Sequence, residues 1–441
     1  MTGMSIRAMA SALPGENGVK GAVLTGRDIF SLQFREQSKG FKGFFTRFIS
    51  KKTLEKTGRL VDRLENKTGI KTRNILLDNV AKYPNTYLGI TAAVRTLEKA
   101  GVLPSKVQGF YYSTDTPDFV FPAQGLAVAK LLGIKPVQFG NSSLACVSMA
   151  QGLYEASGWI DRELCDNALI LLGDVTSRLR LPHSNLERYI FGDGFVGIFL
   201  EKGKGGFKFT NIGIDPEVSD VFVHNQIYAS QCLNYSSYEL QDNFQYNDAA
   251  LDILGEIDAV EYSYGLDDYL RNFGEVIDEK VKIGTPQGGK NSITKGMEIF
   301  KENTGIDITT NVIQSSSYKH GNIGAGALAL SMLEGGVSLD DTVISSIAGV
   351  GGVKTVFEIN PSFDGIKTKR ITDAKPRPDY REIVERSIEE LRRKKRKGKF
   401  ELSELAISDL GEIKFTPISH KPMELTNLDR VMRSISNSAA L

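Results

Sequence analysis

The first half of the chain alternates strand-length apolar runs with segments in which apolar residues recur every three to four positions. This alternation is typical of an α/β fold with layered sheets. The expected strands are 108–114, 137–143, 167–175 and 195–203. The expected helices are 124–133, which ends at Gly133, and 147–161.

The second half, which opens with 206–215, repeats that order of elements. The expected strands are 281–284, 311–316, 341–349 and 354–360. The expected helices are 291–305, with Gly305 as the C-cap, and 324–336. The strand pair that closes each half occupies a matching place, and this predicts internal duplication of a five-element unit. We expect one half over 1–205 and the other over 206–360.

Two stretches fall outside this duplicated pattern. Residues 30–66 are basic and aromatic, and we expect them to be largely helical. Residues 361–441 form a predicted C-terminal extension that opens with a linker rich in proline and basic residues, 371–379. A helical stretch from Tyr380 then ends in the run RRKKRKGK, 392–399, and the remainder is loop-like.

Composition indicates an ordinary globular protein. The 441 residues are 41% hydrophobic and 24% charged, enough for two core-sized units. A formal net charge of +1 gives no global preference for nucleic acid or an anionic membrane, so neither is expected as a partner. We assign the basic run 392–397 first to a solvated helix end and second to docking of an acidic carrier protein.

The number of cysteines and the length of the apolar runs indicate the cellular compartment in which the protein acts. The three cysteines, Cys146, Cys165 and Cys232, are too few and too uneven for a disulfide framework, which fits a reducing compartment. The N-terminus lacks the apolar core of a signal peptide, and no stretch approaches the ~18 apolar residues of a membrane span. We expect a cytoplasmic protein.

The segment NSSLACVSMAQGLYEA, 141–156, carries the strongest candidate chemistry. A strand ends, the chain turns through small residues, and Cys146 falls at the start of a helix. Unsatisfied backbone N–H groups and the helix dipole favour the thiolate there, and the thiolate attacks a thioester carbonyl. The backbone N–H of Cys146 can also face an oxyanion. A buried core cysteine is the alternative interpretation, and this segment alone leaves both open.

Two glycine-rich segments imitate cofactor loops. GTPQGGKN, 284–291, nearly matches a phosphate-binding loop, but Asn291 replaces the hydroxyl that would hold Mg²⁺. GNIGAG, 321–326, has the wrong spacing for a dinucleotide loop, and close helix packing explains it better. No Cys/His cluster has metal-ligand spacing. We therefore expect neither a bound cofactor nor a metal.

Several segments, in family order, resemble beta-ketoacyl-ACP synthase III and its relatives. One such motif is a weak signal, but the whole set across residues 1–360 indicates kinship and favours Cys146 as the nucleophile. The segments are RLENKTGIKTRNILLDN (63–79), residues 86–134, NSSLACVSMAQGLYEA (141–156), GDVTSR (173–178), FGDGFVGIFLE (191–201), YKHGNIGAGALALSMLEGG (318–336) and IAGVGG (347–352).

The resemblance implies a five-layered αβαβα thiolase fold, α/β in class, built from two pseudo-duplicated halves. It implies a homodimer and an acyl group delivered to Cys146 as a thioester of coenzyme A or an acyl carrier protein. After acylation of the cysteine, decarboxylation of a malonyl-type extender gives the carbanion that attacks the acyl-enzyme. Asn322 falls on the family's asparagine, which helps to stabilise the enolate oxygen. Gly351 falls near the glycine loop that lines the oxyanion hole with Cys146.

The chain departs from the family at the usual histidine. Alignment on Pro286 puts Gln287 in that place. A glutamine amide can donate a hydrogen bond to an oxyanion but cannot carry a proton or a positive charge. Either Gln287 and Asn322 still support condensation, or the enzyme only transfers an acyl group to another nucleophile. His320 is a candidate replacement base, and its alternative is a loop histidine without a catalytic role.

These observations predict an acyltransferase that loads an acyl group onto Cys146. We expect transfer by Claisen-type condensation with a malonyl-type extender, in fatty-acid-like or polyketide biosynthesis. One alternative is a non-condensing acyltransferase that forms an ester, an amide or a carbon–carbon bond on a small acceptor. A rival of another class is a non-catalytic partner subunit of a ketosynthase.

Overall fold

The fold is known from a computed structural model. It describes residues 3–29, 51–77, 81–119, 121–178, 189–210, 213–214, 244–285, 289–337, 340–349, 353–378 and 382. Within these ranges, no helix is both long enough and apolar enough to cross a bilayer.

The first sheet has five strands in the order β1-β7-β6-β4-β5. Strands β4, β5 and β6 run parallel, whereas β7 is antiparallel to both β6 and β1. The bounds are β1 (Met4–Ala12), β4 (Gly109–Ser113), β5 (Gln138–Ser142), β6 (Asn167–Val175) and β7 (Asp193–Lys202).

The second sheet has the order β10-β11-β12-β8-β13, and β9 pairs with β12. Strands β10 and β11 are parallel, and β12 is antiparallel to both β11 and β8. A parallel bridge joins Ile283 of β10 to Val312. The bounds are β8 (Gly206–Thr210), β9 (Gly213–Ile214), β10 (Val281–Gly284), β11 (Thr342–Gly349), β12 (Val353–Asn360) and β13 (Gly365–Lys369).

The two sheets repeat one topology. The series β1-β7-β6-β4-β5 matches β8-β12-β11-β10-Val312 in order and in strand direction throughout. The internal duplication predicted from the hydrophobic pattern is therefore confirmed. The expected strand 311–316 contributes only the single bridge at Val312.

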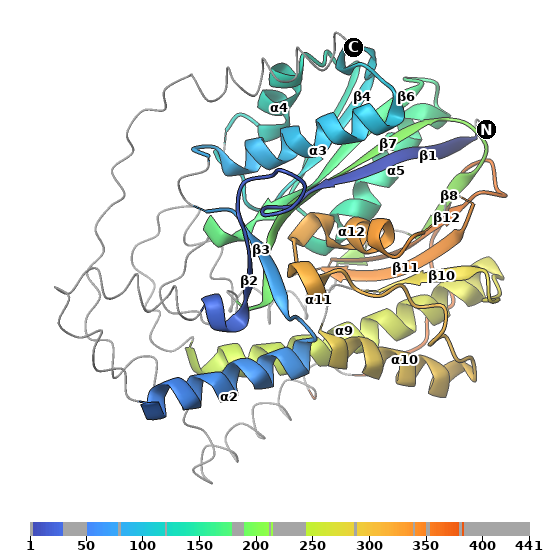
Figure 1. The fold of residues 1–441 in the computed structure, drawn as a ribbon. Coiled ribbons are helices and arrows are strands. Elements are labelled where there is room, and N and C mark those ends of the chain that lie inside the picture. The colour runs from blue at the N-terminus through green and yellow to red at the C-terminus, as the bar shows by residue number, and fades with distance from the viewer. Residues whose placement is uncertain are drawn as a thin grey trace.

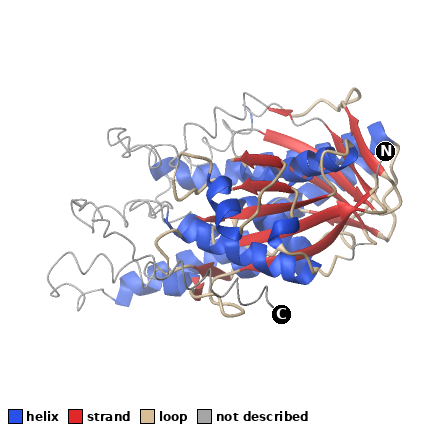
Figure 2. Ribbon diagram, turned by 90° about the horizontal axis from the view of Figure 1, so that it is seen from above, coloured by secondary structure: helices blue, strands red, loops and turns tan. Residues whose placement is uncertain are grey.

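Helices complete five layers, which are stacked from top to bottom in Figure 1 and seen from above in Figure 2. Helices α3 (Pro84–Ala100) and α4 (Gln124–Leu132) cover the outer face of the first sheet. Helices α5 (Ser148–Asp161) and α12 (Ala327–Glu334) lie between the sheets. Helices α9 (Phe244–Phe273) and α10 (Lys290–Thr304) cover the second sheet. This is the expected αβαβα arrangement.

The remaining described elements are short or peripheral. A two-stranded sheet of β2 and β3 and the helix α2 lie at one end of the layers (Figure 1). The bounds are β2 (Ala22–Thr25), α2 (Lys51–Thr68), β3 (Thr72–Ile75), η2 (Pro104–Lys106), η3 (Ala145–Val147), η4 (Thr176–Arg178), α11 (Ser317–His320) and η5 (Gly324–Gly326).

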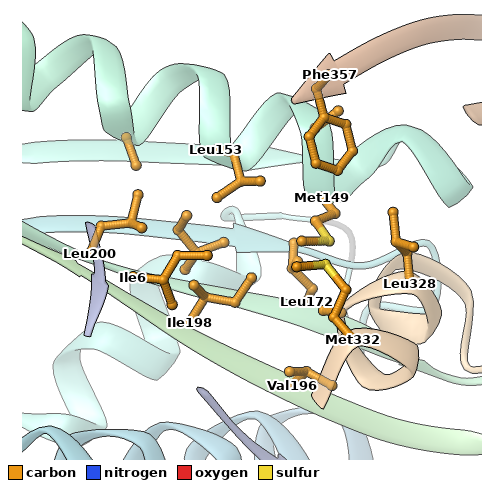
Figure 3. Packing of buried hydrophobic residues seen from close by; sticks show 14 of the residues in the cluster. Ile6, Met149, Leu153, Leu172, Val196, Ile198, Leu200, Leu328, Met332 and Phe357 are labelled. Atoms are coloured by element: carbon orange, nitrogen blue, oxygen red, sulfur yellow. The ribbon is translucent and has the colours of Figure 1, made fainter. Parts of the chain in front are cut away.

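The central core lies between the two sheets. Met149 and Leu153 of α5 face Leu328 and Met332 of α12 across this layer (Figure 3). Because helices cover both faces of each sheet, the central strands are buried on both sides. Every residue of β6 after Asn167 is buried, which explains why 167–175 reads as a continuous apolar run.

Helix α9 was not predicted from the pattern of apolar residues. Tyr262, Leu266 and Tyr269 face the second sheet, but Glu261 and Asp268 on the same helix are also buried. Buried acidic side chains interrupt the apolar period on which a sequence prediction depends.

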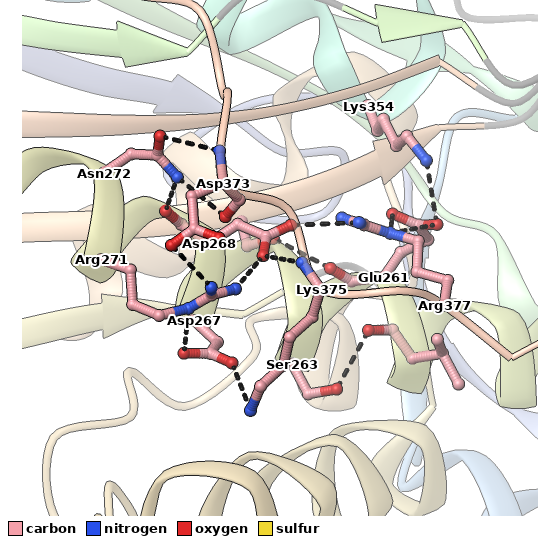
Figure 4. Close-up of polar contacts among 12 residues, drawn as sticks. Glu261, Ser263, Asp267, Asp268, Arg271, Asn272, Lys354, Asp373, Lys375 and Arg377 are labelled. Carbon is pink, nitrogen blue, oxygen red and sulfur yellow. Dashed lines mark hydrogen bonds and ion pairs between the residues drawn. The ribbon is translucent and has the colours of Figure 1, made fainter.

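The buried acids of α9 are paired with a later segment, residues 371–378. Lys375 Nζ lies 3.0 Å from a carboxylate oxygen of Asp267, and Arg377 Nη1 lies 3.0 Å from one of Asp268 (Figure 4). The predicted extension therefore contributes to the folded body both β13 and the ion pairs that Lys375 and Arg377 make with α9. The predicted helix from Tyr380 and the basic run lie outside the described residues.

Candidate active site

Cys146 lies where the sequence places it, between the end of β5 and the start of α5. It is the second residue of the short turn η3, and its side chain is partly exposed. The turn requires a left-handed backbone at Ala145, whose φ is +46°. The backbone N–H groups at the start of α5 therefore converge near the sulfur.

A carboxylate supports this turn from the neighbouring strand. Asp115 follows β4, and its Oδ1 accepts hydrogen bonds from Ser143 Oγ (2.6 Å) and from the backbone N–H of Ala145 (3.3 Å). Because β4 and β5 are parallel, their carboxyl ends meet at one edge of the sheet. This places the acid and the nucleophile side by side.

The second sheet approaches Cys146 through a glycine. A Cβ at Gly349, the last residue of β11, would lie 3.6 Å from the Cys146 backbone nitrogen and 3.4 Å from the Leu144 oxygen. The missing side chain lets the end of β11 pack closely against the backbone of the Cys146 turn.

Two predicted site residues, Gln287 and Gly351, lie outside the described residues. The strands that precede them, β10 and β11, are parallel and end at the same edge of the second sheet. Their roles remain predictions.

Asn322 occupies the turn between α11 and η5. Its backbone N–H donates to the Ile190 oxygen (2.8 Å), and its side-chain Oδ1 accepts from the Gly324 N–H (2.9 Å). The side chain is largely buried. The turns η3 and η5 lie against one another, so the asparagine segment and the cysteine segment meet at the centre of the fold.

His320 is engaged elsewhere. Its Nδ1 lies 2.7 Å from Asn74 Oδ1, and its Nε2 lies 2.5 Å from a carboxylate oxygen of Glu334 on α12. The ring is fully buried. Both ring nitrogens are therefore occupied by structural partners, and the predicted role of His320 as a base for the thiol has no support in these contacts.

Asp174, at the end of β6, holds the turn η5. Its Oδ2 accepts from the Ala325 N–H (2.9 Å), and its Oδ1 accepts from the backbone N–H of Asp115 (2.7 Å) and from Thr114 and Thr116. Burial raises the pKa of Asp174 to about 7, the Asp115 charge adds to this, and the N–H donors oppose it. A carboxylate oxygen thus occupies the place that faces the N–H of η5.

The surroundings of the Cys146 thiol act against ionisation. Burial raises the pKa of the thiol well above its usual range, and the carboxylates of Asp258, Asp115 and Asp174 raise it further. The helix dipole alone would lower the thiol pKa, so the shift has the opposite sign to the one expected from the sequence. Three acidic side chains and a low dielectric outweigh a few partial charges at a helix start. The resting thiol is therefore protonated at neutral pH.

Other residues of the quoted motifs hold loops together. Arg73 of β3 is fully buried and donates to the Tyr189 backbone oxygen through Nε (2.8 Å). Asp193 accepts from the Leu76 N–H (2.7 Å) and from Ser177. These contacts tie β3 to the loops that surround η5.

Three acidic residues that lie near the thiol were not identified from the sequence. Asp115 follows one expected strand and Asp174 lies at the end of another. Because the carboxyl ends of parallel strands meet at one edge, this signal was available. Asp258 gave no such signal, because it lies inside a helix that was not predicted.

Comparisons with known proteins agree with this architecture, although no family model matches the chain. Beta-ketoacyl-[acyl-carrier-protein] synthase III of Desulfitobacterium hafniense is 32% identical over 152 residues, which are 34% of this chain and 45% of that protein. The aligned segment thus spans about half the length of this relative.

Solved structures show the same fold over a longer stretch. The crystal structure of 3-oxoacyl-[acyl-carrier-protein] synthase III from Aquifex aeolicus covers 81% of this chain and 100% of its own, at a TM-score of 0.56 and 18% identity. A tetronic acid condensing enzyme covers 81% of this chain and 99% of its own, at a TM-score of 0.53 and 17% identity.

The chain therefore shares its duplicated five-layered fold with these 3-oxoacyl-ACP synthase III and condensing-enzyme structures. Over about a third of its length the chain is also similar in sequence to beta-ketoacyl-ACP synthase III.

Proposed function

We propose that this protein is an acyltransferase that takes an acyl group from a coenzyme A or acyl-carrier-protein thioester onto Cys146. The supporting observation is the position of Cys146, which is partly exposed in η3 at the start of α5, beside the turn that carries Asn322. A thioester carbonyl bound there has a nucleophile on one side and a backbone donor for its oxygen. Acylation splits the transfer into two easier steps.

We further propose that the acyl group is transferred by Claisen-type condensation with a malonyl-type extender, in fatty-acid-like or polyketide biosynthesis. Asn322 and Gln287 would supply the hydrogen bonds to the enolate oxygen. The fold shared with a tetronic acid condensing enzyme supports this chemistry. The protein would act in the cytoplasm as a homodimer and use no cofactor of its own.

Intact-protein mass spectrometry with coenzyme A thioesters from acetyl to palmitoyl, and with matching acyl carrier protein thioesters, tests the loading step. We expect an adduct of the acyl mass on the wild type and none on Cys146→Ala. Cys165→Ala is the matched control, because Cys165 is a buried cysteine outside the turn. An equal adduct on Cys146→Ala, or none on the wild type with any donor, would refute acyl loading.

A second candidate is a non-condensing acyltransferase that acts on a small neutral acceptor. The observation in its favour is the cluster of Asp115, Asp174 and Asp258 around the thiol, because these acids repel the carboxylate of a malonyl group. The unusual Gln287 points the same way, since glutamine carries no positive charge.

The two candidates differ in carbon dioxide release. Acylated enzyme is mixed with malonyl-CoA labelled in its free carboxylate, and trapped label is counted. Release that depends on Cys146 supports condensation. A stable acyl-enzyme that releases no label from malonyl-CoA or malonyl carrier protein supports the second candidate. A non-catalytic partner subunit would give no acyl-enzyme at all.

A further inference from the structure

Asp258 lies on α9, outside every segment that the sequence analysis assigned to the site. It is the charged group with the largest effect on the Cys146 thiol, ahead of Asp115, which touches the same turn. Because Coulomb effects fall with distance, this order indicates that Asp258 lies near the thiol.

The packing of α9 on the second sheet supports that position independently. Glu261 carries its backbone oxygen 3.2 Å from Ser346 Oγ of β11 and a carboxylate oxygen 3.1 Å from Lys354 Nζ of β12. Lys354 pairs with Ala348, the neighbour of Gly349. Asp258 precedes Glu261 by about one helical turn. It therefore lies level with the end of β11, where Gly349 meets Cys146.

The three acids near the thiol differ in their partners. Asp174 and Asp115 accept hydrogen bonds that hold η5 and η3 in place. Asp258 is half-buried, and in the described part of the chain its carboxylate has no hydrogen bond or ion pair. Burial and the charge of Glu261 raise its pKa to about 7. A proton acceptor at neutral pH needs both properties, an uncommitted carboxylate and a raised pKa.

The charged groups near Asp258, in the part of the chain that the structure describes, come from its own helix and from the first sheet. On its own helix lie Glu256, which pairs with Lys295 of α10, and Glu261, which pairs with Lys354 of β12 and with Arg377. Asp115 and Asp174 face the same thiol from the first sheet. The pairs compensate Glu256 and Glu261.

We propose that Asp258 is the acid–base residue of the loading step, a role that rests on the acyl transfer proposed above. The Asp258 carboxylate takes the proton of the Cys146 thiol as the sulfur attacks the thioester carbonyl. The carbon–sulfur bond to coenzyme A then breaks, and the carboxylic acid returns the proton to the departing thiolate. One thioester is exchanged for another, free coenzyme A leaves as the thiol, and no other reactant is needed.

Two rates measured on Asp258→Asn test this role. One is acylation of Cys146 by the acyl-CoA that labels the wild type fastest, and the other is alkylation of Cys146 by iodoacetamide. We expect acylation at pH 7 to fall about a hundredfold, because the base is lost. We expect alkylation at pH 8 to rise about threefold, because a negative charge beside the thiol is removed. A structural defect would move both rates in the same direction.

The pH profile and two further variants complete the design. Wild-type acylation should rise with pH through an apparent pKa near 7, as Asp258 loses its proton, and Asp258→Asn should lack this rise. Asp258→Glu should restore part of the rate. Glu256→Gln, on the opposite face of α9, should leave both rates within about twofold of the wild type.

The outcomes separate the two proposals. A wild type that is labelled normally, together with Asp258→Asn acylation at the wild-type rate, would overturn the role of Asp258 alone. Unchanged alkylation in Asp258→Asn would show that the carboxylate does not face the thiol and would also overturn it. A wild type that no donor labels would instead refute the proposed function.

Discussion

The turn that carries Cys146 in the first half has the same backbone as the turn that follows Asn322 in the second half. Ala145 has a φ of +46°, and Gly324, at the matching position, has a φ of +61°. Each then makes one short 3₁₀ turn before a central helix. Cys146 thus corresponds to Ala325.

The two turns differ in what the opposite sheet presents to them. Asp174 of the first sheet places a carboxylate oxygen on the Ala325 N–H, whereas the second sheet presents Gly349, which has no side chain, to the Cys146 turn. One turn of the duplicated fold is thus capped by a carboxylate from the opposite sheet, and the other meets a glycine. If the Cys146 turn binds a thioester as proposed, its carbonyl oxygen would take the place that the Asp174 oxygen takes at the other turn.

Removing the carboxylate should have the largest effect. Asp174→Ala leaves the buried N–H groups of Asp115 and Ala325 and two threonine hydroxyls without their acceptor. We expect a loss of about 3–5 kcal/mol in stability. Thermal unfolding followed by circular dichroism measures it. A melting temperature close to that of the wild type would contradict the structural role of this acid.

Alanine at the two glycines should separate stability from chemistry. A Cβ at Gly324 would lie 1.8 Å from Asp174 Oδ2 at a positive φ, so Gly324→Ala should destabilise the fold by about 2–4 kcal/mol. A Cβ at Gly349 would lie 3.2 Å from Val147 Cγ2, a side-chain atom that can shift slightly, so Gly349→Ala should cost much less stability than Gly324→Ala. It should slow acylation of Cys146 about tenfold or more, because the added methyl group crowds the Cys146 backbone nitrogen. Equal effects of both changes on melting and acylation would refute the comparison.

A change at Asp115 should alter the electrostatics around the Cys146 thiol. Asp115→Asn keeps the oxygen that accepts from Ala145 but removes the charge that raises the pKa of the thiol. The thiol pKa should fall, and alkylation by iodoacetamide at pH 8 should rise about threefold. Asp166→Asn is the control, because Asp166 is exposed and pairs with Lys202. A slower reaction in Asp115→Asn would contradict the assigned sign.

The smallest effect is expected from making the first turn more like the second. Ala145→Gly removes the strain of a left-handed alanine, about 1–2 kcal/mol, and adds the chain entropy of glycine, about 0.5–1 kcal/mol. The net gain in stability should be about 0.5–1 kcal/mol, seen as a slightly higher melting temperature. A lower melting temperature would mean that the Ala145 side chain packs better than its backbone suggests.

Many of the strand and helix bounds were predictable from local sequence patterns. The expected strand 167–175 has the observed bounds of β6, and Gly133 and Gly305 end their helices in the left-handed conformation. The placement of Cys146 followed from a strand, small residues and a helical period in direct succession. These features depend on neighbours a few residues apart.

Features that depend on distant partners were not accessible from the sequence. The orientation of His320 is set by Asn74, 246 residues away, and by Glu334. The sign of the thiol pKa shift depends on acids from three separate segments, one of them in the unpredicted α9. A helix dipole can be read from a sequence, but the charges that outweigh it cannot.

The ion pairs between α9 and the segment 371–378 have a consequence for folding during translation. Asp268 is paired by Arg377, 109 residues later, and Glu261 by the same arginine, 116 residues later. At about 5–20 residues per second, a ribosome needs several seconds to deliver that partner after α9 has emerged. The first sheet, with its cysteine turn, can fold during this interval, while Asp268 and Glu261 have only their earlier partners Arg271 and Lys354. The packing of α9 on the second sheet should therefore reach its full stability only after translation has passed residue 377.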